Sequence, residues 1–370
     1  MKVAICGYPS LALKLQQGLR NSGIEIKVFI KDFIVKSEGA TPNLPLIDFF
    51  YFRRLVNAGE LDGVIIAADA QSNFTKGIVP IFKFYGIAQV GVIDLTLPNP
   101  NAPIYWLDSH KIFLPYLEAD ITDICNLKCS SCYHFANFSF TDDLYPIESF
   151  RRDIRQVMQK CDIVKFRLLG GEPLLMKKLD RYIEITRQYL PKANLGIVSK
   201  GLLIPSLSPK ILDALRENNF MVYISVYPPT KKILDKIKAV LDVNKIPYHL
   251  DPVEKFLSRM TLNGNHDPLK TRCICSSDIC RTMINGKIYK CPIDAFSFKF
   301  KDRFDIKIFS SPTGVDIYAE NFSSMLERLD GNVELCYWCA EKHRQNQWEP
   351  TNNPKLEEWL ADPDELKNFI

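Results

Sequence analysis

The sequence lacks several features that would assign it to a simple functional class. No apolar run approaches the roughly 18 residues that a membrane-spanning helix needs, so we expect no membrane span. The 370 residues carry a formal net charge of only +4, which gives no reason to expect a nucleic-acid-binding face. No internal repeat or low-complexity segment is found, which leaves an ordinary globular protein.

The N-terminus also lacks the pattern of a secretion signal. The first 13 residues are apolar with an early lysine, but Gly7, Pro9 and Lys14 interrupt the run, and no small-residue cleavage site follows. The chain nevertheless has 11 cysteines. Without a secretion signal, these cysteines favour metal ligation in a reducing cytoplasm over disulfides. We therefore expect a cytoplasmic protein.

Residues 1–108 are expected to form a small Rossmann-like α/β domain with a parallel sheet. The expected strands cover residues 2–6, 24–30, 61–67 and 89–92, and the expected helices cover residues 10–21 and 73–85. Such alternation places helices on the faces of a parallel sheet. The first strand–helix turn contains Gly7 alone, so the G-x-G-x-x-G dinucleotide fingerprint is absent.

The order of these elements, with an acidic turn at Asp32, resembles the N-terminal domain of bacterial sugar acyltransferases. That resemblance implies a role in binding nucleotide sugars, and a docking or oligomerisation module is the alternative. Asparagine and proline are dense between Pro98 and Pro103, where they break both helix and strand. We expect a linker there.

Residues 109–255 continue the alternation of strand and helix. The expected strands cover residues 116–124, 162–169, 195–199, 221–226 and 247–250, and the expected helices cover residues 148–160, 179–190, 209–218 and 231–242. Consecutive βα units with polar residues at the strand ends fit a barrel, whose carboxyl-terminal rim carries the chemistry. Glu118, Asp120 and Thr122 share one face of the first strand, which indicates a polar lumen.

Three cysteines follow that first strand at close spacing, namely Cys125, Cys129 and Cys132. Three thiolates in one loop can hold three irons of a cubane cluster and leave the fourth iron open. An open metal position allows chemistry on a ligand that is not protein.

A second motif, Gly170-Gly171-Glu172-Pro173, follows the next expected strand. The two glycines allow the backbone to approach a ligand closely. Glu172 supplies an acceptor for an amino group. A simple glycine turn after a strand is the alternative.

Together, the Cys125-x3-Cys129-x2-Cys132 loop and the Gly170–Pro173 motif resemble the radical S-adenosylmethionine (radical SAM) superfamily. The resemblance implies a partial, open (β/α)6 barrel and a 4Fe-4S cluster whose open iron binds SAM. One electron from the cluster then cleaves SAM to methionine and a 5′-deoxyadenosyl radical, which abstracts hydrogen from a substrate. It also implies an electron donor of the flavodoxin or ferredoxin type.

The same resemblance implies which residues bind SAM. Gly170, Gly171 and Glu172 correspond to the site of its α-amino group. Ser199 and Ser225, at two later strand ends, correspond to ribose contacts, with a plain strand end as the alternative.

The family often has an aromatic residue before the third cysteine. Ser131 stands at that position here and Tyr133 comes just after, so Tyr133 is the candidate for the adenine contact. His134 follows directly and either touches substrate or is simply packed.

Residues 256–370 are expected to form a small, cysteine-rich α+β extension. Asn285-Gly286 predicts a two-residue type I′ hairpin turn, in which Ile284 pairs with Lys287. Extending this register places Cys280 opposite Cys291, close enough to ligate one cluster. Cys336-x2-Cys339 adds a second pair of thiols.

This extension resembles the auxiliary-cluster domains of radical SAM enzymes, called twitch or SPASM. It implies one auxiliary 4Fe-4S cluster on Cys280, Cys291, Cys336 and Cys339, with Cys275 as the first substitute and Cys273 as the next. A structural zinc site and a cross-strand disulfide are the alternatives. Cys6 and Cys161 lie in strand and helix patterns and are expected to be core thiols.

The resulting hypothesis is a radical SAM enzyme. A reactive carbon radical needs its substrate held in place and water excluded, which a barrel closed at one end by a cluster-bearing cap provides. The loop Cys-Asn-Leu-Lys-Cys-Ser-Ser-Cys-Tyr-His-Phe resembles a bacterial subgroup associated with surface polysaccharides. It implies epimerisation, dehydration or oxidation of a nucleotide sugar or glycan precursor. Modification of a ribosomal peptide is the alternative reaction, and a non-enzymatic redox sensor or scaffold that binds a cluster or zinc is the alternative class.

Overall fold

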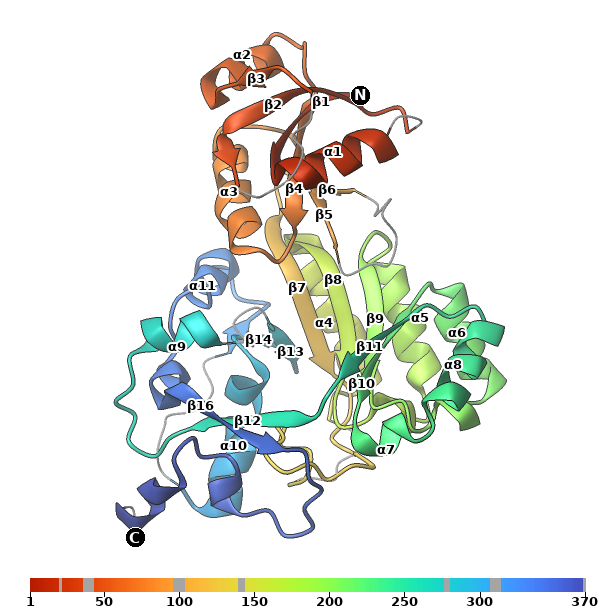
Figure 1. Cartoon of the computed structure of the whole chain (residues 1–370), viewed down its shortest axis with the longest axis vertical. Helices are drawn as coiled ribbons and strands as arrows, with labels where there is room; N and C mark the ends of the chain where they lie inside the picture. The colour runs from red at the N-terminus through yellow and green to blue at the C-terminus, as the bar shows by residue number, and fades with distance from the viewer. Residues whose placement is uncertain are drawn as a thin grey trace. The chain divides into compact units, whose positions relative to one another are not determined.

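The computed structural model describes residues 1–19, 22–35, 43–95, 104–138, 144–275, 280–306 and 314–368 (Figure 1). It divides into two compact units. The first comprises residues 1–115, 159–165 and 192–194, and the second comprises residues 116–158, 166–191 and 195–370. Both units are mixed α/β with parallel strand pairing, which confirms the predicted fold class at that level. The predicted division at residue 255 stays a prediction.

The first unit is built on a six-stranded sheet in the order β3-β2-β1-β4-β5-β6. All pairings are parallel except that of β5 with β6, which is antiparallel. Its elements are β1 (Lys2–Gly7), α1 (Pro9–Gly18), β2 (Glu25–Ile34), β3 (Leu46–Ile47), α2 (Phe49–Asn57), β4 (Gly63–Asp69), α3 (Asn73–Phe84), β5 (Gln89–Ile93) and β6 (Tyr105–Leu107).

The four strands and two helices predicted for this unit are present, whereas β3, α2 and β6 were not predicted. The predicted linker at residues 98–103 lies outside the described residues. Strand β1 is covered on both faces. Val3 and Ile5 pack into one apolar cluster, and Ala4 and Cys6 pack into the other. Burial on both faces explains why these strands read as continuous apolar runs, and it makes Cys6 a core thiol as expected.

A buried cation lies at the carboxyl ends of β4 and β5. The Lys165 ammonium, about 1% exposed, lies 2.7 Å from the Asp94 carboxylate and 3.4 Å from that of Asp69. It also donates to the side-chain oxygen of Gln71. Pairing with two carboxylates compensates the cost of removing this charge from water.

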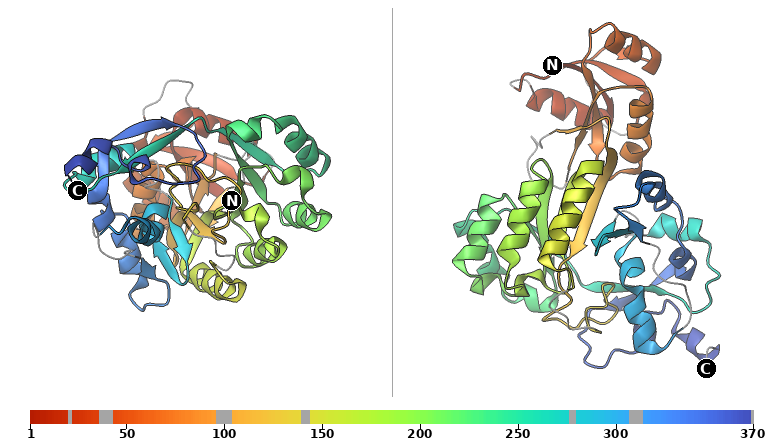
Figure 2. Two further views of the ribbon diagram at one scale, coloured as in Figure 1. Left: turned by 90° about the horizontal axis from the view of Figure 1, so that it is seen from below. Right: turned by 180° about the vertical axis from the view of Figure 1, so that it is seen from behind.

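The second unit contains an eight-stranded sheet in the order β11-β10-β9-β8-β7-β13-β14-β15. Helices α4, α5, α6 and α8 lie along one face of the strands β7 to β11 (Figure 2). The elements of this part are β7 (Ile112–Asp120), α4 (Ile147–Lys160), β8 (Cys161–Leu169), α5 (Leu179–Tyr189), β9 (Asn194–Ser199), α6 (Pro209–Glu217), β10 (Met221–Val226), α7 (Pro228–Lys231), α8 (Leu234–Val243) and β11 (Tyr248–Pro252).

All five strands and four helices predicted between residues 116 and 250 are therefore present. Two short 3-10 turns, Pro173–Leu175 and Ile204–Ser206, follow β8 and β9. Cys161, at the start of β8, is buried as expected for a core thiol. Whether the strands close as a partial six-stranded barrel stays a prediction.

The C-terminal part supplies the end of this sheet and a separate two-stranded sheet, β12-β16. Its elements are β12 (Lys255–Met260), α9 (Pro268–Ile274), β13 (Thr282–Ile284), β14 (Lys287–Tyr289), α10 (Pro292–Phe304), β15 (Val315–Asp316), α11 (Phe322–Arg328), β16 (Cys339–Gln347) and the 3-10 helices Glu334–Trp338, Leu356–Glu358 and Pro363–Asn368.

The predicted hairpin is confirmed. Ile284 pairs with Lys287, and both Asn285 and Gly286 adopt the positive φ that a type I′ turn requires. Strand β13 also pairs in parallel with β7, so that Thr282 lies beside Glu118. No helix in the described part of the chain is both long and apolar enough to cross a membrane.

Candidate active site

The cysteine loop after β7 directs N–H donors at its sulfur atoms. The backbone N–H of Leu127 donates to Cys125 Sγ at 3.3 Å, and the indole N–H of Trp348 donates to Cys129 Sγ at 3.1 Å. Backbone N–H groups also donate to Cys132. Such donors stabilise thiolate over thiol, because hydrogen bonds to the charged form favour it. The three predicted ligands therefore lie in a setting suited to metal-bound sulfur.

Burial opposes ionisation of the Cys129 and Cys132 thiols. Burial, and next the nearby Cys132, raise the pKa of Cys129 to about 12, while the Trp348 hydrogen bond acts in the opposite direction. Burial likewise raises the pKa of Cys132. A buried thiolate needs a positive partner, and iron supplies one. The donor set therefore fits an iron–sulfur cluster.

Gly170 and Gly171 lie against the backbone that leads into the cysteine loop. A Cβ atom on Gly170 would lie 2.2 Å from the carbonyl oxygen of Thr122, and one on Gly171 would lie 2.2 Å from that of Ile124. Gly170 also adopts a φ of +143°. The glycines thus permit close approach of two backbone segments of this chain, with Gly171 N–H donating to the Thr122 carbonyl.

Glu172 is buried, and it lies at the centre of a hydrogen-bond network. Ser199 Oγ donates to its carboxylate at 2.7 Å, and the backbone N–H of Lys200 donates at 3.0 Å. The backbone N–H of Leu174 is a further donor at 3.2 Å. The structure therefore brings the two predicted residues Glu172 and Ser199 together, at the ends of the neighbouring strands β8 and β9.

Lys200 was not predicted as a site residue. Its ammonium donates to the carbonyl of Gly171 and lies 3.9 Å from the Glu172 carboxylate. Burial acts to lower the pKa of Lys200, but the charges of Glu172, Cys125 and Cys132 outweigh it and raise the pKa. The position after Ser199 at a strand end is the only sequence signal that could have identified it.

Two tyrosines lie near the loop, and the adenine contact of Tyr133 stays a prediction. Tyr133 donates its hydroxyl to the carbonyl of Leu257, and its ring lies under the Arg259 guanidinium, 4.2 Å away. Tyr227, which follows β10, has its ring 5.7 Å from that of Trp348. Ser225, two residues earlier, is half-buried near the end of β10.

The segment after β16 holds the cysteine loop. The backbone N–H of Ser130 donates to the Glu349 carbonyl, and that of Thr351 donates to the Lys128 carbonyl. The indole N–H of Trp359 donates to the Cys132 carbonyl at 3.1 Å. No function was predicted for this tail, because nothing local marks a contact with residues more than 200 positions away. We call residues 348–359 the C-terminal strap.

A polar cluster lies on the inner face of β7. His134 Nδ1 lies 2.6 Å from the Asp120 carboxylate, and Glu118 accepts from the hydroxyls of Tyr116 and Thr282. Burial, and next Asp120, raise the pKa of Glu118 to about 7. Burial acts to lower the pKa of His134, but Asp120 outweighs it and raises the pKa.

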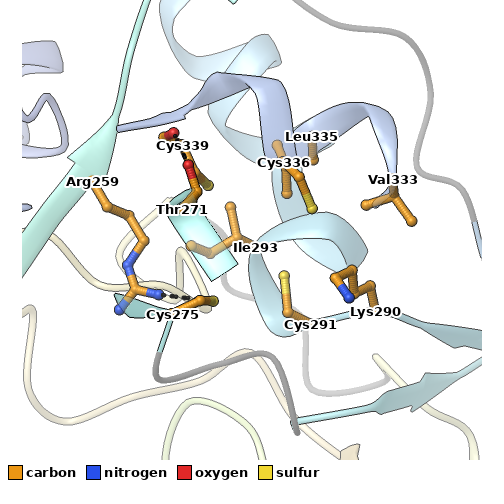
Figure 3. Close-up of a pocket in the computed structure, with 10 residues that line it drawn as sticks. All are labelled: Arg259, Thr271, Cys275, Lys290, Cys291, Ile293, Val333, Leu335, Cys336 and Cys339. Carbon is orange, nitrogen blue, oxygen red and sulfur yellow. Dashed lines mark hydrogen bonds between the residues drawn. The ribbon is translucent and has the colours of Figure 1, made fainter. Parts of the chain in front are cut away.

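Four cysteines from separate elements line one cavity in the C-terminal part (Figure 3). Cys275 follows α9, Cys291 precedes α10, Cys336 lies in a 3-10 helix and Cys339 begins β16. Arg259 and Lys290 line the same cavity. Burial is the main cause that raises the pKa of the Cys291, Cys336 and Cys339 thiols.

Cys280 does not line that cavity. Its pKa is raised well above the usual thiol value, first by burial and next by the charge of Glu118. The hairpin ladder has the predicted register but begins at Thr282, so it does not pair Cys280 with Cys291. Cys280 therefore lies toward the polar cluster on β7. The side chain of Cys273 lies outside the described residues.

Within the described stretches, no group of three or more histidine, cysteine, aspartate or glutamate side chains is arranged to hold a single metal ion. A four-iron cluster distributes its ligands over four separate irons instead. The four-cysteine cavity, with two cations beside it, fits that donor set.

Residues 120–249 match the family model of the Radical SAM superfamily. Among curated proteins, the chain is 30% identical over 110 residues to the GTP 3′,8-cyclase of Sulfurovum sp., which covers 29% of this chain and 33% of the relative. The chain is also 31% identical over 150 residues to the GTP 3′,8-cyclase of Aliarcobacter butzleri, and this match covers 40% of the chain and 45% of the relative. The chain thus spans about a third to a half of these relatives.

Solved structures with some likeness include BtrN in complex with AdoMet and 2-DOIA, at 20% identity and a TM-score of 0.36. That match covers 62% of this chain and 93% of BtrN. Native anSMEcpe with bound AdoMet matches at 15% identity and a TM-score of 0.32, covering 52% of this chain and 50% of anSMEcpe.

The strap makes a prediction about the cysteine loop. Trp348→Ala should accelerate amide hydrogen exchange in residues 125–132, because it removes both the hydrogen bond to Cys129 and the packing on Tyr227. Trp348→Phe keeps an aromatic ring against Tyr227 and loses only the hydrogen bond. It should therefore lower the free energy of opening the loop by less, about 0.5–1.5 kcal/mol. Exchange measured by mass spectrometry on metal-free protein tests this. Equal exchange in the parent and Trp348→Ala would show that Trp348 does not order the loop.

Proposed function

We propose that the chain is a radical SAM enzyme, which abstracts hydrogen from a substrate by cleaving SAM; the match of residues 120–249 to the Radical SAM superfamily model supports this. Cys125, Cys129 and Cys132 hold the 4Fe-4S cluster in this proposal. The observation that carries it is the pairing of two features at adjoining strand ends. One is three thiols that each accept a hydrogen bond from an N–H group, and the other is a buried carboxylate, Glu172.

The cluster and SAM, when bound, supply the carbon radical. The chain supplies the acceptors that hold the amino group of SAM, namely the Gly171 carbonyl and the Glu172 carboxylate. The Lys200 ammonium lies on these same two groups, which supports their suitability for a positively charged nitrogen. In the proposed complex, the amino group of SAM and Lys200 share this acceptor set.

Other contacts to SAM are proposed from the same strand ends. Ser199 and Ser225 remain candidates for the ribose, and Gly170 for the close approach of the backbone. Tyr133 remains the candidate for the adenine. Tyr227 is a second aromatic candidate, because its phenol lies close enough to the three cysteines and Glu172 for their charges to raise its pKa, after burial.

We further propose one auxiliary 4Fe-4S cluster in a twitch- or SPASM-like domain at residues 256–370. Its ligands would be Cys275, Cys291, Cys336 and Cys339, because these four thiols line one cavity. Cys275 thereby takes the place first given to Cys280. Arg259 and Lys290 would offset the negative charge of thiolate-bound iron.

The proposed substrate is a small molecule of the nucleotide-sugar or glycan-precursor class, with a flavodoxin or ferredoxin as the electron donor. The N-terminal sheet has the strand order typical of dinucleotide-binding folds, which is compatible with binding a nucleotide part. GTP is a second candidate, favoured by the names of the curated relatives. A ribosomal peptide remains the third.

Glu172→Gln tests the SAM site. Loss of the carboxylate charge should weaken SAM binding by about 1.5–3 kcal/mol, or roughly ten- to a hundredfold in Kd. Calorimetry on the cluster-loaded protein measures the affinity, and mass spectrometry of 5′-deoxyadenosine follows cleavage. Glu60→Gln, an exposed carboxylate in the first unit, is the matched control and should bind SAM like the parent. A Glu172→Gln variant with parental affinity would refute the assignment.

Iron content tests the auxiliary cluster. Anaerobically reconstituted parent should contain about eight irons per chain, that is, two four-iron clusters. Cys275→Ser should lose about four of them, whereas Cys280→Ser should keep all. Loss in Cys280→Ser but not in Cys275→Ser would restore Cys280 as a ligand. About four irons in the parent would contradict the auxiliary cluster altogether.

A further inference from the structure

One acceptor atom on the inner face of β7 is left without a partner. Asp120 is 1% exposed, and its Oδ1 is paired with His134 at 2.6 Å. Its Oδ2 is buried and has no hydrogen-bond partner among the described residues. Leaving a buried acceptor unsatisfied is destabilising, and more so when the group is charged. Such an atom requires an explanation from a missing ligand or a structural role.

The side chains beside Asp120 make hydrogen bonds of their own. Glu118, on the same face of β7, accepts from the hydroxyls of Tyr116 and Thr282. His134 is fixed by Asp120 itself, and its ring packs 6.0 Å from the ring of Phe296 on α10. Among the groups of this cluster, Asp120 Oδ2 is the buried acceptor that has no partner in the described residues. A ligand that completes it must donate a hydrogen bond.

The chemistry of this acceptor discriminates between substrate classes. A hydroxyl group on a sugar-like ring can donate to a carboxylate oxygen. A phosphate group at neutral pH is anionic and mainly an acceptor, so a buried carboxylate repels it. The nearby buried cation, Lys299, is already paired with Asp123. The polar cluster thus suits the hydroxylated part of a substrate and not a triphosphate.

The location of Asp120 is suited to a substrate. Asp120 is the last residue of β7, five positions before Cys125, and His134 lies two positions after Cys132. Both partners therefore flank the cysteine loop. A group bound to Asp120 lies at the strand end where the radical would be generated, if the proposed function holds.

We propose that Asp120 Oδ2 binds a hydroxyl group of an uncharged, sugar-like ring, with His134 and Glu118 as the residues that position it. The assignment of this site to the substrate rests on the proposed function, whereas the binding of a hydroxyl group at Asp120 does not. It favours a sugar or another polyol as the reacting part of the substrate over the phosphate end of a nucleotide.

The test uses full-length, metal-free protein with 13C-labelled histidine. The chain has only five histidines, so a His134→Gln variant assigns the ring signal of His134 in NMR spectra. The probes are myo-inositol, a ring of hydroxyl groups, and inorganic phosphate. Myo-inositol should shift the His134 signal saturably, whereas phosphate should not. Asp120→Asn should weaken the myo-inositol response at least about tenfold, the effect of losing one hydrogen bond to a charged group.

Asp180→Asn is the control, because it removes a buried carboxylate on α5 that pairs with Lys210 instead. It should respond to myo-inositol like the parent. A response to phosphate alone, no response to either probe, or an unchanged response in Asp120→Asn would each overturn the inference. If Asp120→Asn does not fold, the responses of the parent protein to myo-inositol and to phosphate still test the inference. Because no SAM chemistry is involved, a protein that binds myo-inositol but never cleaves SAM would refute the proposed function and leave this inference standing.

Discussion

The site depends on holding a stretch of chain that has no regular secondary structure of its own. The described residues 121–138 carry the three cysteines and form no helix or strand, so their buried N–H and carbonyl groups must find other partners. Two remote segments provide them. Gly170-Gly171 packs directly against residues 122–124, and the C-terminal strap pairs with residues 128–132. The positions of the thiols are therefore set by tertiary contacts from both sides.

The same contacts link the thiols to the proposed SAM site. The glycine pair that fixes the loop is followed by Glu172, and the carboxylate of Glu172 is held by the side chain of Ser199 and the backbone of Lys200. Cysteines, carboxylate and ammonium thus form one buried, charge-compensated network. Because each member is held by another, a substitution at one position should change the positions of the other side chains. The effects of single substitutions on stability should therefore not be additive.

The elements predicted from the sequence depended on local patterns. Periodicity predicted the main strands and helices up to residue 250 but not β3, α2 or β6, and Asn285-Gly286 was sufficient to predict the register of the β13–β14 hairpin. The cysteine spacing and Glu172 likewise identified the candidate site. The roles of Trp348 and Lys200 could not be predicted, and Cys275 was named only as a substitute for Cys280. Each depends on which distant segments meet in space, and a count along one hairpin cannot reveal that the end of α9 brings Cys275 to the cavity.

The most direct test of the central claim is whether SAM binds at an open iron beside Cys125, Cys129 and Cys132. Electron paramagnetic resonance spectra of the reconstituted, dithionite-reduced protein, recorded with and without SAM, measure this. The account predicts that SAM changes the signal of one cluster, and that this signal is missing when all three cysteines are replaced by alanine, while the auxiliary signal remains. A parent spectrum that is identical with and without SAM would contradict the account.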